Sequence, residues 1–374
     1  MTTLMECYGT VLAAHGPSAT LTFSGFRDLL SGTVAALLPE GVAPEDLDRI
    51  SLLDDGQESA VLFDIDYEQR ILLRAMRRSD GLPGVMTDRQ LVDEVDQEVV
   101  YEAMKKSGKQ DRYELYRSNL IRYPTGSVDD IAALSLPEVA RSAYREISLD
   151  ARFRDWWYAC PVCRWPMRIT APSNGRKGGG LGVARCWYGP HVELGASFDF
   201  RVPDDGSAPM LIPRSPARKR PPRERILTPI LAAPPKALPV EDHRALVRGV
   251  WRYTTVPGLI ELALHDRLKE RGIAVDLWPG LDLFDLRITP PAGTPTPEGG
   301  IKVDVKDYSS AITLGRLLHS QQGDRGGATV LVVPDHRADQ VHLLKNVCSQ
   351  YDMTAVAATD FAESICQEAG ISWS

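Results

Sequence analysis

The chain contains 374 residues, which is enough for two or three domains. Its 43% hydrophobic and 25% charged residues are ordinary for a globular protein, and its net charge of −7 excludes a general attraction to nucleic acid, so such binding must use local basic patches. There is no apolar run of about eighteen residues and no signal-peptide pattern at the start, so we expect a cytoplasmic protein without membrane spans and with reduced cysteines.

Residues 1–150 are predicted to form a mostly helical domain, whose sequence indicates no reaction. Within it, QDRYELYRSNLIRYPTG (residues 110–126) interleaves tyrosines with Arg112, Arg117 and Arg122. Such interleaving is used to grip single-stranded nucleic acid. An amphipathic helix at the edge of a core has the same pattern, and we favour that interpretation.

Residues 151–200 are predicted to form a small β module that resembles a zinc ribbon. Cys160-Pro-Val-Cys163 is followed, after 22 residues, by Cys186-x4-His191. Three thiolates and one imidazole in two pairs are the number and type of ligand that a structural zinc site needs. The alternative is a set of reduced core cysteines. The glycine-rich stretch at 174–182 is expected to be a basic loop between ribbon strands.

Residues 201–240 are predicted to form a proline-rich linker, because dense proline favours extended backbone. Its basic side chains are Arg218, Lys219, Arg220, Arg223 and Arg225, together with Arg214 and Lys236, against the single acid Glu224 between residues 211 and 240. A basic arm of this kind predicts contact with a nucleic-acid backbone. A solvated linker remains the alternative.

Residues 241–374 are predicted to form an α/β domain with a mixed sheet. A helix at 254–272 is followed by a strand at 273–277 and two strand-like runs, LDLFDLRITP (281–290) and IKVDVKDYS (301–309). Alternating helices and short apolar strands then continue to the end of the chain. This order is typical of a sheet covered by helices.

The second of the two runs alternates apolar and charged residues, with Ile301, Val303 and Val305 on one face and Lys302, Asp304 and Lys306 on the other. An antiparallel hairpin of the two runs would bring Asp285, Asp304 and Lys306 together. Two carboxylates beside an ammonium form a hard-oxygen metal site suited to phosphodiester hydrolysis. The alternative is an ordinary half-solvated sheet with one charged face.

Glu261 on the leading helix, then Asp285, then Asp304-Val305-Lys306, resembles the PD-(D/E)xK nuclease superfamily with its restriction-endonuclease fold. The resemblance covers roughly residues 245–374. It implies that Asp285 and Asp304 hold Mg²⁺ or Mn²⁺ and that Glu261 supports the metal through water. Lys306 would activate the attacking water or stabilise the developing charge, and we favour the second role.

The literal Pro-Asp pair of the superfamily is absent, so Asp282 is a rival for the first metal ligand. We favour Asp285, because Asp282 would share a strand face with Phe284 and Leu286, where burying an ion is costly.

The layout is most similar to the restriction-endonuclease-fold proteins found beside prokaryotic PIWI-like proteins (pPIWI-RE) and a helicase in defence systems. The resemblance implies a metal-dependent DNA endonuclease that acts against phage or plasmid DNA. Its partners would be DNA, a PIWI-like protein, a helicase and a second copy of the chain. The alternatives are a catalytically silent nucleic-acid-binding or scaffold subunit and a DNA repair or recombination nuclease.

Overall fold

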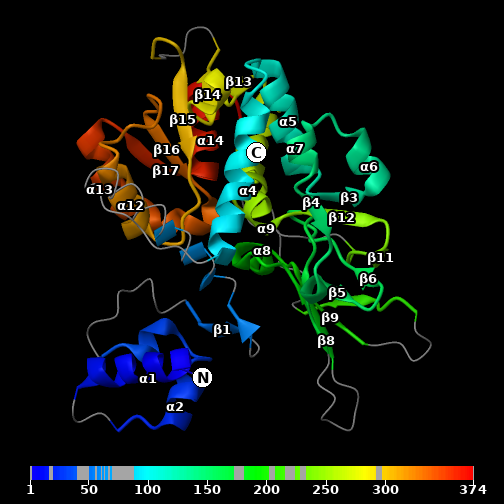
Figure 1. The fold of residues 1–374 in the computed structure, drawn as a ribbon. Helices are drawn as coiled ribbons and strands as arrows, with labels where there is room; N and C mark the ends of the chain where they lie inside the picture. Colours follow the sequence, from blue (N-terminus) through cyan, green and yellow to red (C-terminus); the bar gives the residue numbers. More distant parts are fainter. Residues whose placement is uncertain are drawn as a thin grey trace.

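The structure is a computed structural model, and every statement about it concerns the residues that it describes. These are residues 2–16, 20–39, 50–54, 57–59, 61–62, 64–65, 68–69, 88–171, 181–201, 207–214, 224–227, 233–291 and 297–373. Figure 1 shows a C-terminal sheet flanked by helices, with helices from the first half of the chain beside it.

The C-terminal part is built around a five-stranded sheet with the order β13-β14-β15-β16-β17. Its strands are β13 (Ala274–Leu277), β14 (Leu286–Thr289), β15 (Ile301–Val305), β16 (Val330–Val333) and β17 (Thr354–Ala357). β13, β14 and β15 pair antiparallel, whereas β15, β16 and β17 pair parallel, which confirms the predicted mixed sheet. Leu286 pairs with Val303, so the predicted β14–β15 hairpin is also confirmed.

Helices cover both faces of this sheet (Figure 1). The helical elements are α9 (Arg248–Val250), η4 (Trp251–Thr255), α10 (Val256–Glu270), α11 (Pro279–Asp282), α12 (Ala311–Ser320), η5 (Asp335–Gln340), α13 (Val341–Cys348), η6 (Ser349–Tyr351) and α14 (Ala358–Glu368). Val303 and Val305 join the core formed with α10 and α14, whereas Leu331 and Val333 join the core formed with α12 and α13. The period-two alternation of the strands therefore supplies apolar side chains to both helical layers.

The first strand-like run is shorter than the sequence predicts. Residues 281–290 were expected to be extended throughout, but β14 begins only at Leu286. The backbone is left-handed at Trp278 (φ 47°), Leu281 (φ 58°) and Asp282 (φ 72°), which turns the chain before the strand. Left-handed backbone costs a non-glycine residue roughly 1–2 kcal/mol, so the surroundings must hold this turn.

The first 150 residues contribute mainly helices, as predicted. The elements are α1 (Thr2–His15), α2 (Phe23–Leu29), η1 (Val34–Leu37), α4 (Asp88–Lys105), α5 (Gln110–Arg122), α6 (Val128–Ala133), α7 (Glu138–Arg141) and η3 (Leu149–Ala151), with strands β1 (Leu53–Asp54), β2 (Gln57–Glu58), β3 (Thr125–Ser127) and β4 (Tyr144–Glu146). α5 packs closely on α10, where a Cβ added to Gly258 would lie 2.3 Å from Ile121 Cδ1. One hydrophobic core runs from Val100 to Trp373, so α5 and the C-terminal sheet share it.

Small antiparallel sheets make up the middle of the chain. Their strands are β5 (Arg152–Phe153), β6 (Trp156–Trp157), β7 (Arg168–Thr170), β8 (Gly182–Arg185), β9 (Ser197–Phe200), β10 (Leu211–Pro213), β11 (Leu238–Pro239) and β12 (His243–Leu246), with the helix α8 (Gly189–Glu193). The sheet orders are β10-β9-β8-β7, β11-β6-β5 and β3-β12-β4. β10 and β11 come from the predicted linker and pair with β9 and β6, so parts of that segment belong to the fold.

None of the described helices is long and apolar enough to cross a membrane.

Candidate active site and metal centre

Asp285, Asp304 and Lys306 meet at one end of the β14–β15 hairpin. Asp285 directly precedes β14, Asp304 lies in β15, and Lys306 directly follows β15. Lys306 Nζ lies 2.7 Å from Asp304 Oδ1 and 3.4 Å from Asp285 Oδ2. The same Asp285 oxygen accepts the Val305 N–H at 2.6 Å, which fixes the carboxylate against the strand. The three side chains thus lie together, as the predicted hairpin requires.

Burial controls the charges in this cluster, since Asp285 and Asp304 are only 6% and 5% exposed. Burial raises the pKa of Asp285 well above its usual range, and Glu261 and Asp304 add to this, although Lys306 opposes it. For Lys306 burial lowers the pKa, but the carboxylates of Asp285 and Asp304 outweigh burial and raise the pKa above its usual value. Lys306 is therefore an ammonium at neutral pH.

Glu261 lies in α10 beside this cluster, and its carboxylate is already engaged. Arg117 Nη2 from α5 lies 3.1 Å from Oε1 and 2.9 Å from Oε2, and the Trp278 indole N–H also donates to Oε2. Burial raises the pKa of Glu261, although Arg117 opposes this. The expected role of Glu261 in supporting a metal through water stays a prediction.

The rival ligand Asp282 lies in the turn α11. The expectation that it shares a strand face with Phe284 and Leu286 is therefore wrong. Arg117 forms an ion pair with Asp282, and the Tyr113 hydroxyl donates to Asp282 Oδ2 at 3.0 Å. Burial raises the pKa of Asp282, but Arg117 and Tyr113 outweigh this and lower it below its usual value. Asp285, not Asp282, is the carboxylate that hydrogen-bonds Lys306.

Gln110 of α5 holds the left-handed turn that leads to Asp285. Its side-chain amide donates to the carbonyls of Leu277 and Trp278 at 3.0 Å and 2.9 Å, and accepts the Leu281 N–H at 3.0 Å. The Trp278 N–H in turn donates to the Asp285 carbonyl at 2.8 Å. α5 therefore supports the position of Asp285 through backbone contacts.

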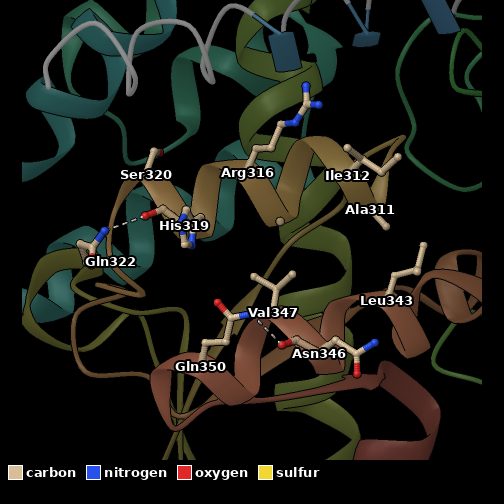
Figure 2. A pocket seen from close by; sticks show the side chains of 11 residues that line it. Ala311, Ile312, Arg316, His319, Ser320, Gln322, Leu343, Asn346, Val347 and Gln350 are labelled. Atoms are coloured by element: carbon tan, nitrogen blue, oxygen red, sulfur yellow. Dashed lines mark hydrogen bonds between the residues drawn. The ribbon is translucent and has the colours of Figure 1, made fainter. Parts of the chain in front are cut away.

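A pocket of about 210 Å³ adjoins this cluster. It is lined by Arg117, Glu261, Asp282, Asp285, Lys306, Asp307, Glu68, Gln97, Arg252, Tyr253, Pro257, Val305 and Tyr308. A larger groove of about 860 Å³ lies between α12 and α13 (Figure 2). Its walls include Ile312, Leu343 and Val347 and are mainly apolar. Asp285, Glu261 and Asp282 line the smaller pocket together with Lys306, so this pocket and the adjacent Asp304 form the candidate active site.

The carboxylates of this pocket suit a hard divalent cation. Mg²⁺ prefers oxygen ligands and keeps several waters, so two carboxylates are enough to hold it. Asp304 Oδ2 is buried and has no hydrogen-bond partner among the described residues, with Arg325 Nε 3.5 Å away. Buried polar atoms are normally hydrogen-bonded. This oxygen has only the ion pair with Arg325 among the described residues, so it keeps lone pairs for a metal ion. The residues present fit Mg²⁺ or Mn²⁺.

A second cluster is formed by Cys160, Cys163, Cys186 and His191, as the spacing predicts. All four are buried, and their ligand atoms lie within 4.8 Å of one another. Cys163 Sγ and Cys186 Sγ are 3.8 Å apart, and Cys186 Sγ lies 3.5 Å from His191 Nδ1. This Cys3His cluster can hold a metal ion such as zinc, for which sulfur and nitrogen ligands are suited.

Electrostatics within the Cys3His cluster favour a thiolate. Burial raises the pKa of Cys160, but hydrogen bonds from Cys163, Cys186 and His191 outweigh burial and hold this pKa well below its usual range. The thiolate is the form of cysteine that binds metal. Burial and the neighbouring cysteines raise the pKa values of Cys163 and Cys186 well above their usual range, so Cys160 is the thiol of the cluster that is favoured as a thiolate.

Comparison with known families bears on the C-terminal part of the chain. Residues 258–373 match the family described as the REase associating with pPIWI_RE. These residues form an REase-like domain. The resemblance inferred from Glu261, Asp285, Asp304 and Lys306 is confirmed over this range, which contains all four. No significant match was found among curated proteins or among solved structures.

The REase-like domain does not build the pocket alone, and the other contributors leave only weak signals in the sequence. Arg117 was noted in a Tyr/Arg pattern, but its contact with Glu261 spans 144 residues and follows from the packing of α5 on α10. Arg117 and Tyr113 are 7% and 0% exposed, so the interpretation that α5 grips nucleic acid with them is wrong. Their pairing with the acids was missed because such long-range contacts leave no local periodicity.

The predicted nucleic-acid contacts lie mainly outside the described residues. Arg218, Lys219, Arg220 and Arg223 belong to this group, as do residues 174–180 of the glycine-rich stretch at 174–182. Arg225 is described and exposed. Its neighbour Glu224 forms ion pairs with Arg267 and Arg271, which fasten this short segment to α10 and to the residue that follows it. Nucleic-acid binding by the basic arm stays a prediction.

Proposed function

We propose that this protein is a metal-dependent DNA endonuclease that acts in defence against phage or plasmid DNA together with a PIWI-like protein. The observation that carries the proposal is the convergence of Asp285 and Asp304 on Lys306 Nζ, beside a pocket that Asp285 and Lys306 line. The match of residues 258–373 to an REase that associates with pPIWI_RE supports both the reaction class and the partner. A helicase partner and a homodimer are further expectations.

Asp285 and Asp304 would hold Mg²⁺ or Mn²⁺. Such an ion, when bound, polarises a phosphate and lowers the pKa of its water. Lys306 places a positive charge beside these carboxylates, where the negative charge of a transition state would develop. Since both carboxylates keep Lys306 protonated, the electrostatic role is favoured over a role as general base. Burial strengthens this electrostatic contribution because little water screens it.

We further propose that the Cys3His cluster holds one structural zinc ion. Four protein ligands complete a tetrahedral site and leave no open position for substrate, which is typical of structural zinc. The small sheets around this cluster contribute Trp157 and Phe200 to the shared core, and a bound metal would add to their stability.

A catalytically silent subunit is the second candidate, and one observation favours it. Arg117 and Trp278 already engage both oxygens of Glu261, and Lys306 lies between the two carboxylates that would hold the metal. A pocket neutralised by its own cations can persist as a structural feature without catalysis. Under this alternative the chain would bind nucleic acid or its partner without cutting.

Cleavage of plasmid DNA distinguishes the two candidates. The full chain is incubated with plasmid and Mg²⁺ or Mn²⁺, with and without chelator and with and without its PIWI-like partner. We expect metal-dependent cleavage that Asp304→Ala and Lys306→Ala abolish. The matched control is Lys302→Ala on the same strand, whose ammonium lies 5.5 Å from the centre of the Phe284 ring. Cleavage that persists in both folded site variants would refute the assignment, and binding without cleavage would favour the silent subunit.

A further inference from the structure

Tyr188 is built into the Cys3His cluster through its backbone and its ring. Its N–H donates to Cys186 Sγ at 3.4 Å, and its carbonyl accepts the His191 N–H at 3.0 Å. The ring packs edge-on against the His191 imidazole, with the centroids 4.8 Å apart. The position of Tyr188 therefore depends on two of the four cluster residues.

The hydroxyl of Tyr188 leaves this module and reaches the REase-like domain. It donates to Asp307 Oδ2 and lies 3.0 Å from His336 Nε2. Asp307 is the residue directly after Lys306, and its side chain is only 3% exposed. Tyr188 itself is 2% exposed, so water does not replace this contact. One side chain thus joins the Cys3His module to the residue that follows Lys306, across 119 residues of sequence.

The contacts around Asp307 are polar, and the Asp307 side chain is buried while those of His336 and Arg337 are partly exposed. His336 Nε2 and Arg337 Nε lie 3.4 Å and 3.2 Å from Asp307 Oδ1. The guanidinium of Arg252 lies 4.8 Å from the centre of the Tyr188 ring and makes a cation–π contact with it. A buried carboxylate keeps a defined position only while its partners are in place. Among the described residues, loss of the Tyr188 hydroxyl would remove the partner of Asp307 that comes from the Cys3His module.

We propose that Tyr188 is a positioning residue through which the Cys3His centre fixes the chain that follows Lys306, and hence the ammonium between Asp285 and Asp304. Metal in the cluster orders Tyr188, Tyr188 orders Asp307, and Asp307 sets the backbone direction next to Lys306. This inference rests on the proposed nuclease function for its catalytic consequence. The structural coupling itself does not depend on that function.

Tyr188→Phe tests the coupling because it keeps the ring and removes only the hydroxyl. The matched control is Tyr158→Phe, a buried tyrosine of the same region whose hydroxyl donates to the Pro209 carbonyl at 2.6 Å. We expect Tyr188→Phe to retain its zinc and to show at least ten-fold faster amide hydrogen exchange at residues 305–309. We also expect kcat for plasmid cleavage to fall roughly ten-fold with little change in KM. A ten-fold fall in kcat corresponds to about 1.36 kcal/mol in activation free energy. Tyr158→Phe should leave these readouts unchanged.

Removal of the cluster metal provides the second arm. In the unmodified chain, stripping zinc should accelerate exchange at residues 305–309, whereas in Tyr188→Phe it should add little there. Such non-additivity identifies Tyr188 as the connection between the centres. Equal effects of stripping in both proteins, or equal exchange in Tyr188→Phe and Tyr158→Phe, would overturn the inference. If Tyr188→Phe does not fold, Asp307→Asn replaces it and should give the same increase in exchange.

The two proposals fail in different ways. If the full chain shows the exchange coupling but cuts no DNA with its partner and metal, the nuclease proposal fails and the coupling stands. If Lys306→Ala abolishes cleavage while Tyr188→Phe leaves kcat and exchange unchanged, the coupling fails and the nuclease proposal stands.

Discussion

Arg117 Nη2 lies 2.9 Å from Glu261 Oε2, and this ion pair joins α5 to the first helix of the REase-like domain in the interior of the protein. The two side chains are 9% and 2% exposed. The same guanidinium pairs with Asp282 and lies 4.6 Å from the centre of the Trp278 ring. A helix outside the matched residues therefore neutralises two acids of the candidate site.

Arg117→Leu should destabilise the protein strongly, because it leaves Glu261 and Asp282 buried without their counter-ion. We expect a loss of about 3–5 kcal/mol in the free energy of unfolding. Arg122→Leu is the matched control, since Arg122 and Asp266 join the same two helices 3.0 Å apart but are 46% and 41% exposed. It should cost at most about 1 kcal/mol. Denaturant unfolding measures both, and similar losses for the two variants would contradict a specific role for the buried pair.

Lys306→Ala should strengthen divalent metal binding while it abolishes cleavage. The ammonium lies 2.7 Å from Asp304 Oδ1 and competes with a metal ion for the same oxygens. We expect roughly ten-fold tighter Mn²⁺ binding by calorimetry in Lys306→Ala, and at least ten-fold weaker binding in Asp285→Asn. Lys302→Ala should behave like the unmodified chain. Weaker Mn²⁺ binding in Lys306→Ala would show that the lysine supports the metal site instead of competing with it.

The Cys3His cluster should contain about one zinc ion per chain, measured by elemental analysis of protein purified without chelator. Cys186→Ser should lose this zinc and unfold at lower denaturant concentration, because binding energy at such sites contributes to folding. Cys7→Ser changes an exposed thiol outside the cluster and should retain the metal. If Cys186→Ser keeps its zinc, or if the unmodified chain contains none, the cysteines are core residues.

Glu68 should make stability depend on pH. Its carboxylate accepts the N–H and the hydroxyl of Ser309, each at 2.6 Å, and burial raises its pKa from 4.5 to about 7. The folded protein then holds a proton that the unfolded chain releases near pH 4.5. The stability that this proton contributes to the folded state is therefore complete below about pH 4.5. It is lost as the pH rises to about 7, and it does not change further above that pH.

Between these two pH values the free energy of unfolding should fall by at most about 3 kcal/mol, at roughly 1.36 kcal/mol per pKa unit. Glu68→Gln mimics the neutral carboxyl. Its stability relative to the unmodified chain should therefore be higher at pH 8 than at pH 5. Urea unfolding at the two pH values measures this, with the exposed Glu98→Gln as control. A parallel pH dependence in Glu68→Gln and the unmodified chain would show that another group titrates.

Local patterns in the sequence predicted much of the C-terminal fold and the composition of both clusters. The period-two alternation of residues 301–306 specifies which side chains share a face, whatever the rest of the chain does. The Cys-x2-Cys and Cys-x4-His spacings bring ligands close within two short segments. The run at 281–285 was predicted wrongly as strand, because a turn held by Gln110 from another helix overrides local propensity.

Tertiary structure alone decided what surrounds these patterns. The pairing of Arg117 with Glu261 and of Tyr188 with Asp307 joins residues 144 and 119 positions apart. Contacts of this kind depend on how helices and sheets pack, and one side chain per element leaves no repeating signal in sequence. The sequence by itself therefore determined which acids, cysteines and lysine could form the two centres. Packing determined that Arg117 pairs with Glu261 and that the Tyr188 hydroxyl reaches Asp307.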